Sequence, residues 1–204
     1  MTFAHCEVIS KGAQHAAPLL FWANRREGQP RCSAERVRPT ISAMPVTLRA
    51  HEPQDFAALL RLDQSCFPPG IAYSKTMLRY FLKLPSADGM VAEDAGRIVG
   101  FILTEENPPL AHVITLDVAE THRRQGVGSA LLAESEKNLA LRGVRTILLE
   151  TATSNEAGVA FWQRHGYRIE ATLKRYYLQK IDAYEMRKIL PGAWKMAKHP
   201  GEMI

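Results

Sequence analysis

Apolar and polar residues alternate along most of this chain with periods typical of strands and helices. Val46–Arg49 predicts a short strand, and Asp55–Cys66 carries apolar side chains at helical spacing. Cys66–Ser74 contains two prolines and a glycine and therefore predicts a loop, after which Ser74 suits the N-cap of a second helix. Met90–Glu106 predicts a hairpin, because two β-rich runs flank the sequence DAGR.

The second half of the chain continues this mixture of strands and helices. His112–Val118 and Thr146–Ala152 predict strands, and the segment between them predicts a helix that Gly143 ends. Later patterns predict a short helix in SNEAGVAFWQRHG and two closing strands in YRIEATLKRYY and DAYEMRKIL. Strands separated by single helices indicate an α/β domain around one mixed sheet, which we expect to have about six or seven strands with flanking helices.

The N-terminal region lacks such periodicity. Residues 1–43 hold three prolines, scattered arginines and no sustained pattern, so we expect a disordered or loosely packed extension. We therefore place the working domain at residues 44–190, beginning near Met44, and treat residues 191–204 as a C-terminal tail.

Composition and charge narrow the classes of function. The 204 residues are 46% hydrophobic and 23% charged, which fits a soluble globular domain. No run approaches the roughly 18 apolar residues of a membrane span, and AAPLLFWA lacks the basic start and cleavage site of a signal peptide. The three cysteines are too widely spaced for a disulfide framework or a metal site. Without a membrane span or a signal peptide, we expect a cytoplasmic protein. The net charge of +5 is diffuse, so we expect binding to neither nucleic acid nor membrane.

A glycine-containing turn at Arg123–Leu132, RRQGVGSALL, is the first candidate for chemistry. The first turn of a helix offers unpaired N–H groups and the positive end of the helix dipole, and glycine lets a phosphate approach the backbone closely. The spacing R-x-x-G-x-G differs from the dinucleotide-binding and P-loop patterns, so it indicates neither. Taken alone, the two glycines are also compatible with a tight turn that serves only packing.

The longer stretch LDVAETHRRQGVGSALL resembles the acetyl-coenzyme A motif of the GNAT family of N-acetyltransferases. Three later segments agree in order and spacing, namely LLETATSN, AFWQRHGY and RYY…DAYEM. The resemblance covers roughly Val46–Leu190, and its closing part is most similar to protein N-terminal acetyltransferases, including those of ribosomal proteins. It implies the GNAT fold, acetyl-CoA as co-substrate and acetyl transfer to a primary amine, with a protein N-terminal α-amine as the first choice.

The resemblance also implies a cofactor site. The end of one strand would bind pantetheine and polarise the thioester carbonyl through its backbone, at Leu116, Asp117 and Val118. Backbone N–H groups would hold the pyrophosphate at Arg123, Arg124, Gln125, Gly126, Val127, Gly128 and Ser129. Asn155 would bind the pantetheine arm through its side-chain amide.

Two side chains are candidates for the base that takes a proton from the acceptor amine. Glu150 lies within the apolar strand ILLETA, where a carboxylate is costly without a partner, and it matches the catalytic glutamate of ribosomal-protein acetyltransferases. His112 matches a tyrosine implicated in proton transfer in related enzymes, and alternation would place it on one face with Ile114, Leu116 and Val118. Each residue has a solvent-facing alternative, and we favour Glu150 as the base.

The family's usual general acid is a tyrosine, and the matching position in this chain is Trp162. Because an indole N–H does not release its proton, either Tyr167 or Tyr176 substitutes, or the thiolate leaves without a proton donor. This departure favours the alternative of a non-catalytic acyl-CoA-binding module.

Acceptor-binding residues are likewise implied by the resemblance. Phe67 and Pro68 match a substrate-lining loop, Ile114 belongs to the substrate side of the cofactor strand, and Tyr176 and Tyr177 match an aromatic pair that binds peptide backbone. Strand aromatics also simply pack a sheet, and alternation lets only one of the two tyrosines face the site unless the strand bends. A lysine or a small-molecule amine is the alternative acceptor, and we expect a monomer or homodimer without a metal.

Overall fold

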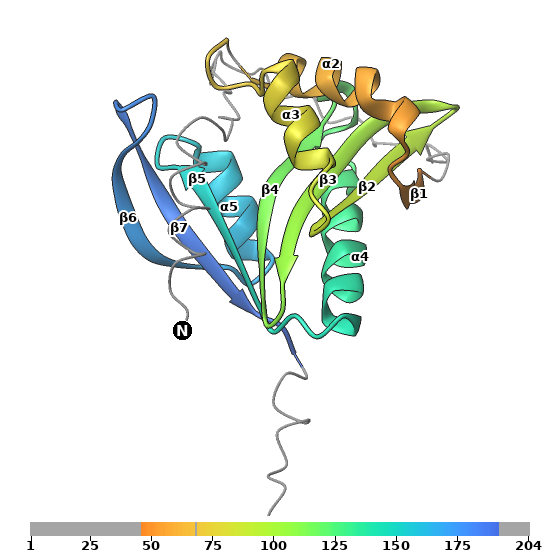
Figure 1. Cartoon of the computed structure of the whole chain (residues 1–204). Helices are drawn as coiled ribbons and strands as arrows, with labels where there is room; N and C mark the ends of the chain where they lie inside the picture. The colour runs from red at the N-terminus through yellow and green to blue at the C-terminus, as the bar shows by residue number, and fades with distance from the viewer. Residues whose placement is uncertain (1–45, 68, 192–204) are drawn as a thin grey trace, which may run out of the picture.

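The computed structural model of the chain describes residues 46–67 and 69–191 (Figure 1). The predicted N-terminal extension and residues 192–204 of the predicted tail lie outside the described residues, so the domain boundaries stay predictions. Among the described helices, none is long and apolar enough to span a membrane.

Strands and helices follow one another in nearly the order that the sequence predicts. The strands are β1 (Thr47–Ala50), β2 (Ala87–Asp94), β3 (Arg97–Asn107), β4 (Leu110–Val118), β5 (Thr146–Ala152), β6 (Arg168–Tyr177) and β7 (Ile181–Ile189). The α-helices are α2 (Phe56–Cys66), α3 (Lys75–Leu82), α4 (Val127–Leu141) and α5 (Glu156–Arg164), with 3₁₀ turns η2 (Pro53–Asp55) and η3 (Glu120–His122).

The seven strands form one mixed sheet in the order β1-β2-β3-β4-β5-β7-β6, which confirms the predicted fold class. All neighbours are antiparallel except β4 and β5, which run parallel. These two strands pair only at their beginnings, through Leu110–Thr146, Ala111–Ile147 and His112–Leu148. Beyond those pairs they diverge, and Figure 1 shows the gap that opens between them toward their C-terminal ends.

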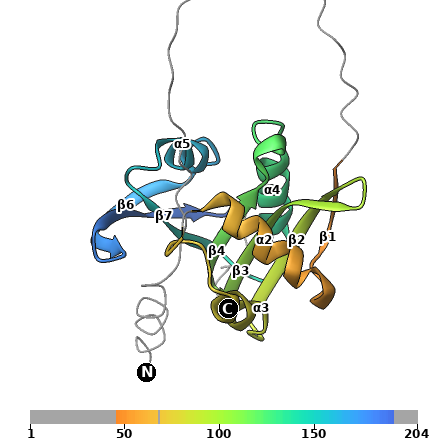
Figure 2. The same cartoon turned by 90° about the horizontal axis from the view of Figure 1, so that it is seen from above.

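Helices cover both faces of this sheet, with α4 and α5 on one side and α2 and α3 on the other (Figure 2). Leu131 and Trp162 belong to the hydrophobic cluster on the first side, and Leu59 and Leu78 to the cluster on the second. The predicted apolar stripe of α4 is confirmed, because Leu131 and Leu139 are both almost fully buried.

The predicted helix boundaries are set by local hydrogen bonding and backbone geometry. Ser74 caps α3 as expected, since its hydroxyl accepts a hydrogen bond from the Met77 N–H at 3.2 Å. Gly143 follows the C-cap of α4 with a φ of +89°, a left-handed conformation that favours glycine. The helix expected from Asp55 begins one residue later, because Asp55 ends the 3₁₀ turn η2.

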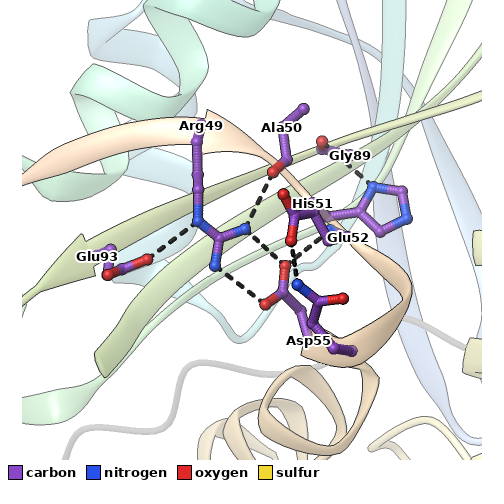
Figure 3. Close-up of polar contacts among 8 residues, drawn as sticks. Arg49, Ala50, His51, Glu52, Asp55, Gly89 and Glu93 are labelled. Atoms are coloured by element: carbon purple, nitrogen blue, oxygen red, sulfur yellow. Dashed lines mark hydrogen bonds and ion pairs between the residues drawn. The ribbon is translucent and has the colours of Figure 1, made fainter. Parts of the chain in front are cut away.

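A partly buried ion-pair cluster fastens the edge strand β1 to the rest of the domain (Figure 3). The Arg49 guanidinium contacts the Asp55 carboxylate at 2.7 Å and the Glu93 carboxylate at 3.0 Å, so it links β1 to η2 and to β2. The hydrogen bond from Arg49 outweighs the effect of burial and lowers the pKa of Asp55.

Strand β4 contains a bulge that the sequence pattern does not reveal. Leu103 of β3 pairs with Thr115, whereas the next residue of β3, Thr104, pairs with Val113. Ile114 is therefore the extra residue of β4, and side-chain alternation is interrupted there.

The prediction that His112, Ile114, Leu116 and Val118 share one face is consequently wrong. Ile114 belongs to the cluster under α2 and α3, and alternation places His112 on that side as well. Leu116 and Val118 pack against the cluster under α4 and α5. Because of the bulge, β4 presents His112 and Ile114 to the face of the sheet under α2 and α3. Leu116 and Val118 lie on the face under α4 and α5.

Candidate active site

The two candidate bases meet where β4 and β5 begin to diverge. His112 belongs to the last β4–β5 pair, and Glu150 lies two residues beyond its partner on β5. Their side chains form a contact of 2.7 Å between Nε2 and Oε2. With side chains only 17% and 14% exposed, neither residue takes the solvent-facing alternative.

Attraction between the two side chains opposes the effect of burial on each of them. Burial alone lowers the pKa of His112, but the charge and hydrogen bond of Glu150 outweigh it, and the net shift is upward. Burial raises the pKa of Glu150, but the charge and hydrogen bond of His112 outweigh it, and the net shift is downward. The Glu150 carboxylate therefore stabilises the His112 imidazolium whenever that ring takes up a proton.

The two tyrosines at the end of β6 both lie near this pair. A hydrogen bond with Tyr176 helps to lower the pKa of Glu150, and burial together with the Glu150 charge raises the pKa of Tyr177. The strand bends just before them, since Arg175 has a φ of +53° and the β6–β7 register shifts between Leu173 and Tyr177. This bend is why alternation does not separate the two rings.

Of the two tyrosines proposed to replace the family's general acid, Tyr167 and Tyr176, only one interacts with the His112–Glu150 pair. Trp162 is 9% exposed and packs edge-on against Tyr167, so it is a core residue. Tyr167 donates a hydrogen bond to Glu136 and takes part in the same core cluster, under α4 and α5. Of the two proposed substitutes for the general acid, Tyr176 is therefore the one beside Glu150.

The end of β4 presents its backbone to the gap, because β5 no longer pairs with it there. Asp117 is 1% exposed and accepts a hydrogen bond from Thr115, so its side chain faces the interior. Arg123 donates from Nε to the Val118 carbonyl oxygen at 2.9 Å and lies 3.5 Å from the Cys66 sulfur. Its guanidinium thus holds the following turn against the strand end.

The turn before α4 has the geometry expected of an anion site. Gly126 is the N-cap with a φ of +89°, and a Cβ at this position would meet no other described atom within 4 Å, so the backbone conformation alone favours glycine. The first helical hydrogen bond runs from the Ala130 N–H to the Gly126 carbonyl. The preceding N–H groups, those of Val127, Gly128 and Ser129, consequently have no acceptor within the helix and lie at its positive end.

Asn155 has a structural role beside the one that the resemblance implies. It is the N-cap of α5, where its Oδ1 accepts from the Gly158 N–H at 2.9 Å and its Nδ2 donates to Thr151 at 3.3 Å. The residue is 4% exposed. Its contact with a cofactor arm stays a prediction.

The loop between α2 and α3 contains the two residues, Phe67 and Pro68, that are predicted to line the acceptor site. Phe67 lines a cavity of about 650 Å³, and Pro68 lies outside the described residues. Tyr73, which sequence reasoning missed, donates a hydrogen bond to the Ile114 carbonyl at 3.2 Å, at the bulge of β4. Its backbone N–H donates to Asp63 at 2.7 Å, so α2 and the bulge are connected through this one residue.

Known proteins share both the sequence pattern and the fold. A model of the Acetyltransferase (GNAT) family matches residues 56–167. An uncharacterized N-acetyltransferase of Methanocaldococcus jannaschii is 32% identical over 149 residues, which cover 72% of this chain and 93% of that protein. N-alpha-acetyltransferase 30 of Schizosaccharomyces pombe is 31% identical over 117 residues, 55% of this chain and 78% of that protein. The crystal structure of Ard1 from Thermoplasma volcanium, 29% identical, superimposes with a TM-score of 0.65 and covers 71% of this chain and 97% of that chain.

Replacing the carboxylate of the pair tests its electrostatics. In the Glu150→Gln variant the pKa of His112 should fall below its value in the unaltered protein, because burial then acts without the opposing charge. Titration of the His112 ring signals by NMR measures this shift. Glu185→Gln is the matched control, since Glu185 lies directly opposite Glu150 on β7 and has a smaller influence on His112. An unchanged His112 titration in Glu150→Gln contradicts the assignment.

Proposed function

Because the chain belongs to the GNAT family of acetyltransferases, we propose that it transfers the acetyl group of acetyl-CoA to a protein N-terminal α-amine. The observation that carries this proposal is the His112–Glu150 contact at the point where β4 and β5 diverge. The S. pombe relative is named as an N-alpha-acetyltransferase, and this name supports the choice of acceptor.

Acetyl-CoA fits the side of the gap that α4 and α5 cover. The turn at Gly126 offers unpaired N–H groups to a pyrophosphate, and the free edge of β4 at Leu116–Val118 offers backbone groups to the pantetheine arm. An N–H group of that edge aimed at the thioester oxygen would stabilise the charge that develops when the amine attacks. The thioester would then lie in the gap between the diverging strands.

The acceptor amine approaches from the opposite side, under α2 and α3. Ile114 and His112 face this side because of the bulge. Tyr176 and Tyr177 lie beside the same region, because both tyrosines interact with Glu150. Two substrates reaching the same gap from opposite faces can react directly, without a covalent enzyme intermediate.

The pair supplies the base that the amine requires. An α-ammonium has a pKa near ~8, against ~10.4 for a lysine, so little help frees the α-amine at neutral pH. Since the pKa of His112 is raised and that of Glu150 is lowered, neutral His112 is the better proton acceptor near pH 7, and Glu150 stabilises the imidazolium that forms. The proposal therefore differs from the expectation from the sequence, in which Glu150 is the base, because here His112 takes the proton and Glu150 stabilises it.

The leaving thiolate completes the reaction when the carbon–sulfur bond breaks. A free thiol has a pKa near ~8.5, so its thiolate is a tolerable leaving group without a strong acid. This agrees with the presence of Trp162 where the family has a tyrosine. The proton collected by His112 is then available for the thiolate or for water.

Two peptides distinguish the acceptors directly. We expect a peptide with a free α-amine and no lysine to be acetylated about 100-fold faster at pH 7 than an N-terminally blocked peptide with one lysine, because its amine is more often neutral. Mass spectrometry of both reactions with acetyl-CoA measures the ratio. Preferential modification of the blocked peptide identifies a lysine acetyltransferase, and acetyl-CoA binding without turnover of either peptide identifies a non-catalytic module.

Substitution of each member of the pair tests the proton transfer. His112→Phe and Glu150→Gln should each lower kcat by about 100-fold while acetyl-CoA affinity is retained, because neither side chain faces the cofactor turn. The residual activity of Glu150→Gln should rise with pH at a lower pH than in the unaltered enzyme, since its His112 loses the proton earlier. The same acceptor serves in every assay, so its own titration cancels.

Full activity in Glu150→Gln would overturn the role of the pair. Full activity in His112→Phe, with loss only in Glu150→Gln, would assign the proton to Glu150 alone. Glu185→Gln provides the control for a neighbouring charge on the same face and should retain most of the activity.

A further inference from the structure

A histidine of α5 contacts the proposed pyrophosphate turn. His165, the C-cap of α5, places Nε2 at 3.0 Å from the Ser129 hydroxyl in the first turn of α4. Its other ring nitrogen, Nδ1, lies 2.8 Å from the Phe161 carbonyl oxygen. The imidazole therefore bridges the two helices that flank the cofactor side of the gap.

These two contacts fix how the neutral ring must be protonated. A carbonyl oxygen only accepts, so Nδ1 carries the hydrogen and donates it to Phe161. Nε2 of the neutral ring is then an acceptor, and the Ser129 hydroxyl donates to it. In this state the Ser129 oxygen has only lone pairs left for a ligand.

A phosphate does not match a hydroxyl in that state, because its oxygens are also acceptors. If Nε2 is protonated, it donates to the Ser129 oxygen, and the hydroxyl hydrogen becomes free to point at the phosphate. The imidazolium also adds a positive charge beside the anion. Phosphate binding at the turn and protonation of His165 therefore favour each other.

We propose that His165 is a cofactor-positioning residue, which takes up a proton from solvent at Nε2 when a pyrophosphate binds. The Ser129 hydroxyl can then donate a hydrogen bond to the phosphate. This inference rests on the acetyl-CoA site of the proposed function. Because linkage is reciprocal, the affinity for the pyrophosphate group should rise as the pH falls.

The surroundings of His165 are compatible with a positive charge. The Phe161 ring packs against the imidazole at 4.3 Å between centroids, a separation at which an aromatic face attracts a cation. Lys188 of β7 lies near the adjacent Gly166 and forms an ion pair with Glu136 of α4. Arg164 of α5 is exposed, and within the described residues no ion pair includes His165.

Calorimetric titration with dephospho-coenzyme A measures the proton directly, because this probe keeps the pyrophosphate and lacks the separate 3′-phosphate that titrates itself. Binding enthalpies at one pH in buffers of different ionisation enthalpy give the number of protons taken up. We expect net uptake by the unaltered protein, and a Kd that weakens about fivefold or more from pH 6 to pH 8. His165→Gln and Ser129→Ala should both reduce the uptake and flatten the pH dependence.

His51→Asn is the matched control, since His51 lies beside β2 at the other edge of the sheet, and it should leave the proton uptake unchanged. Equal uptake in the unaltered protein and in His165→Gln overturns the role of His165 while leaving the cofactor site intact. If the unaltered, folded protein does not bind the probe or acetyl-CoA at all, the proposed cofactor site itself is wrong.

Discussion

The divergence of β4 from β5 after three residue pairs is the constraint on which the rest of the site depends. If β4 and β5 stayed paired along their whole length, their facing backbone N–H and C=O groups would bond to each other and no gap would open in the sheet. Because pairing stops at His112, the later part of β4 has an edge that β5 does not pair with, and Glu150 lies across the gap instead of within a closed ladder. In the proposed reaction, the two substrates reach this opening from opposite faces of the sheet.

Two local features convert this opening into an asymmetric site. The bulge at Ile114 changes the face of β4, so that His112 and Ile114 lie on the proposed acceptor side and Leu116 and Val118 on the proposed cofactor side. The partly buried pair of His112 and Glu150 then lies at the junction of the two sides. A single charge at this position would lose hydration at a cost in free energy. The charged form of each residue is favoured because the other residue compensates for that loss.

Features governed by short stretches of sequence could be predicted, and features that join distant segments could not. The Ser74 cap and the Gly143 terminus follow from residue type alone, and both are confirmed. The bend at Arg175 could not be foreseen, because an arginine rarely adopts a positive φ. The bulge, its Tyr73 contact and the His165–Ser129 bridge depend on pairing between elements that periodicity does not reveal. Glu150 and His112 could each be predicted from the sequence as a candidate base, but their direct contact could not.

Backbone hydrogen exchange, followed by NMR with and without coenzyme A, tests the central claim that the opened edge of β4 and the adjoining turn form the cofactor site. The account predicts slower exchange on binding for the amides of Leu116–Val118 and Val127–Ser129, and no change along β1 and the first half of β6 at the two outer edges of the sheet. Coenzyme A that binds without protecting either segment, or that protects an outer strand instead, would contradict it.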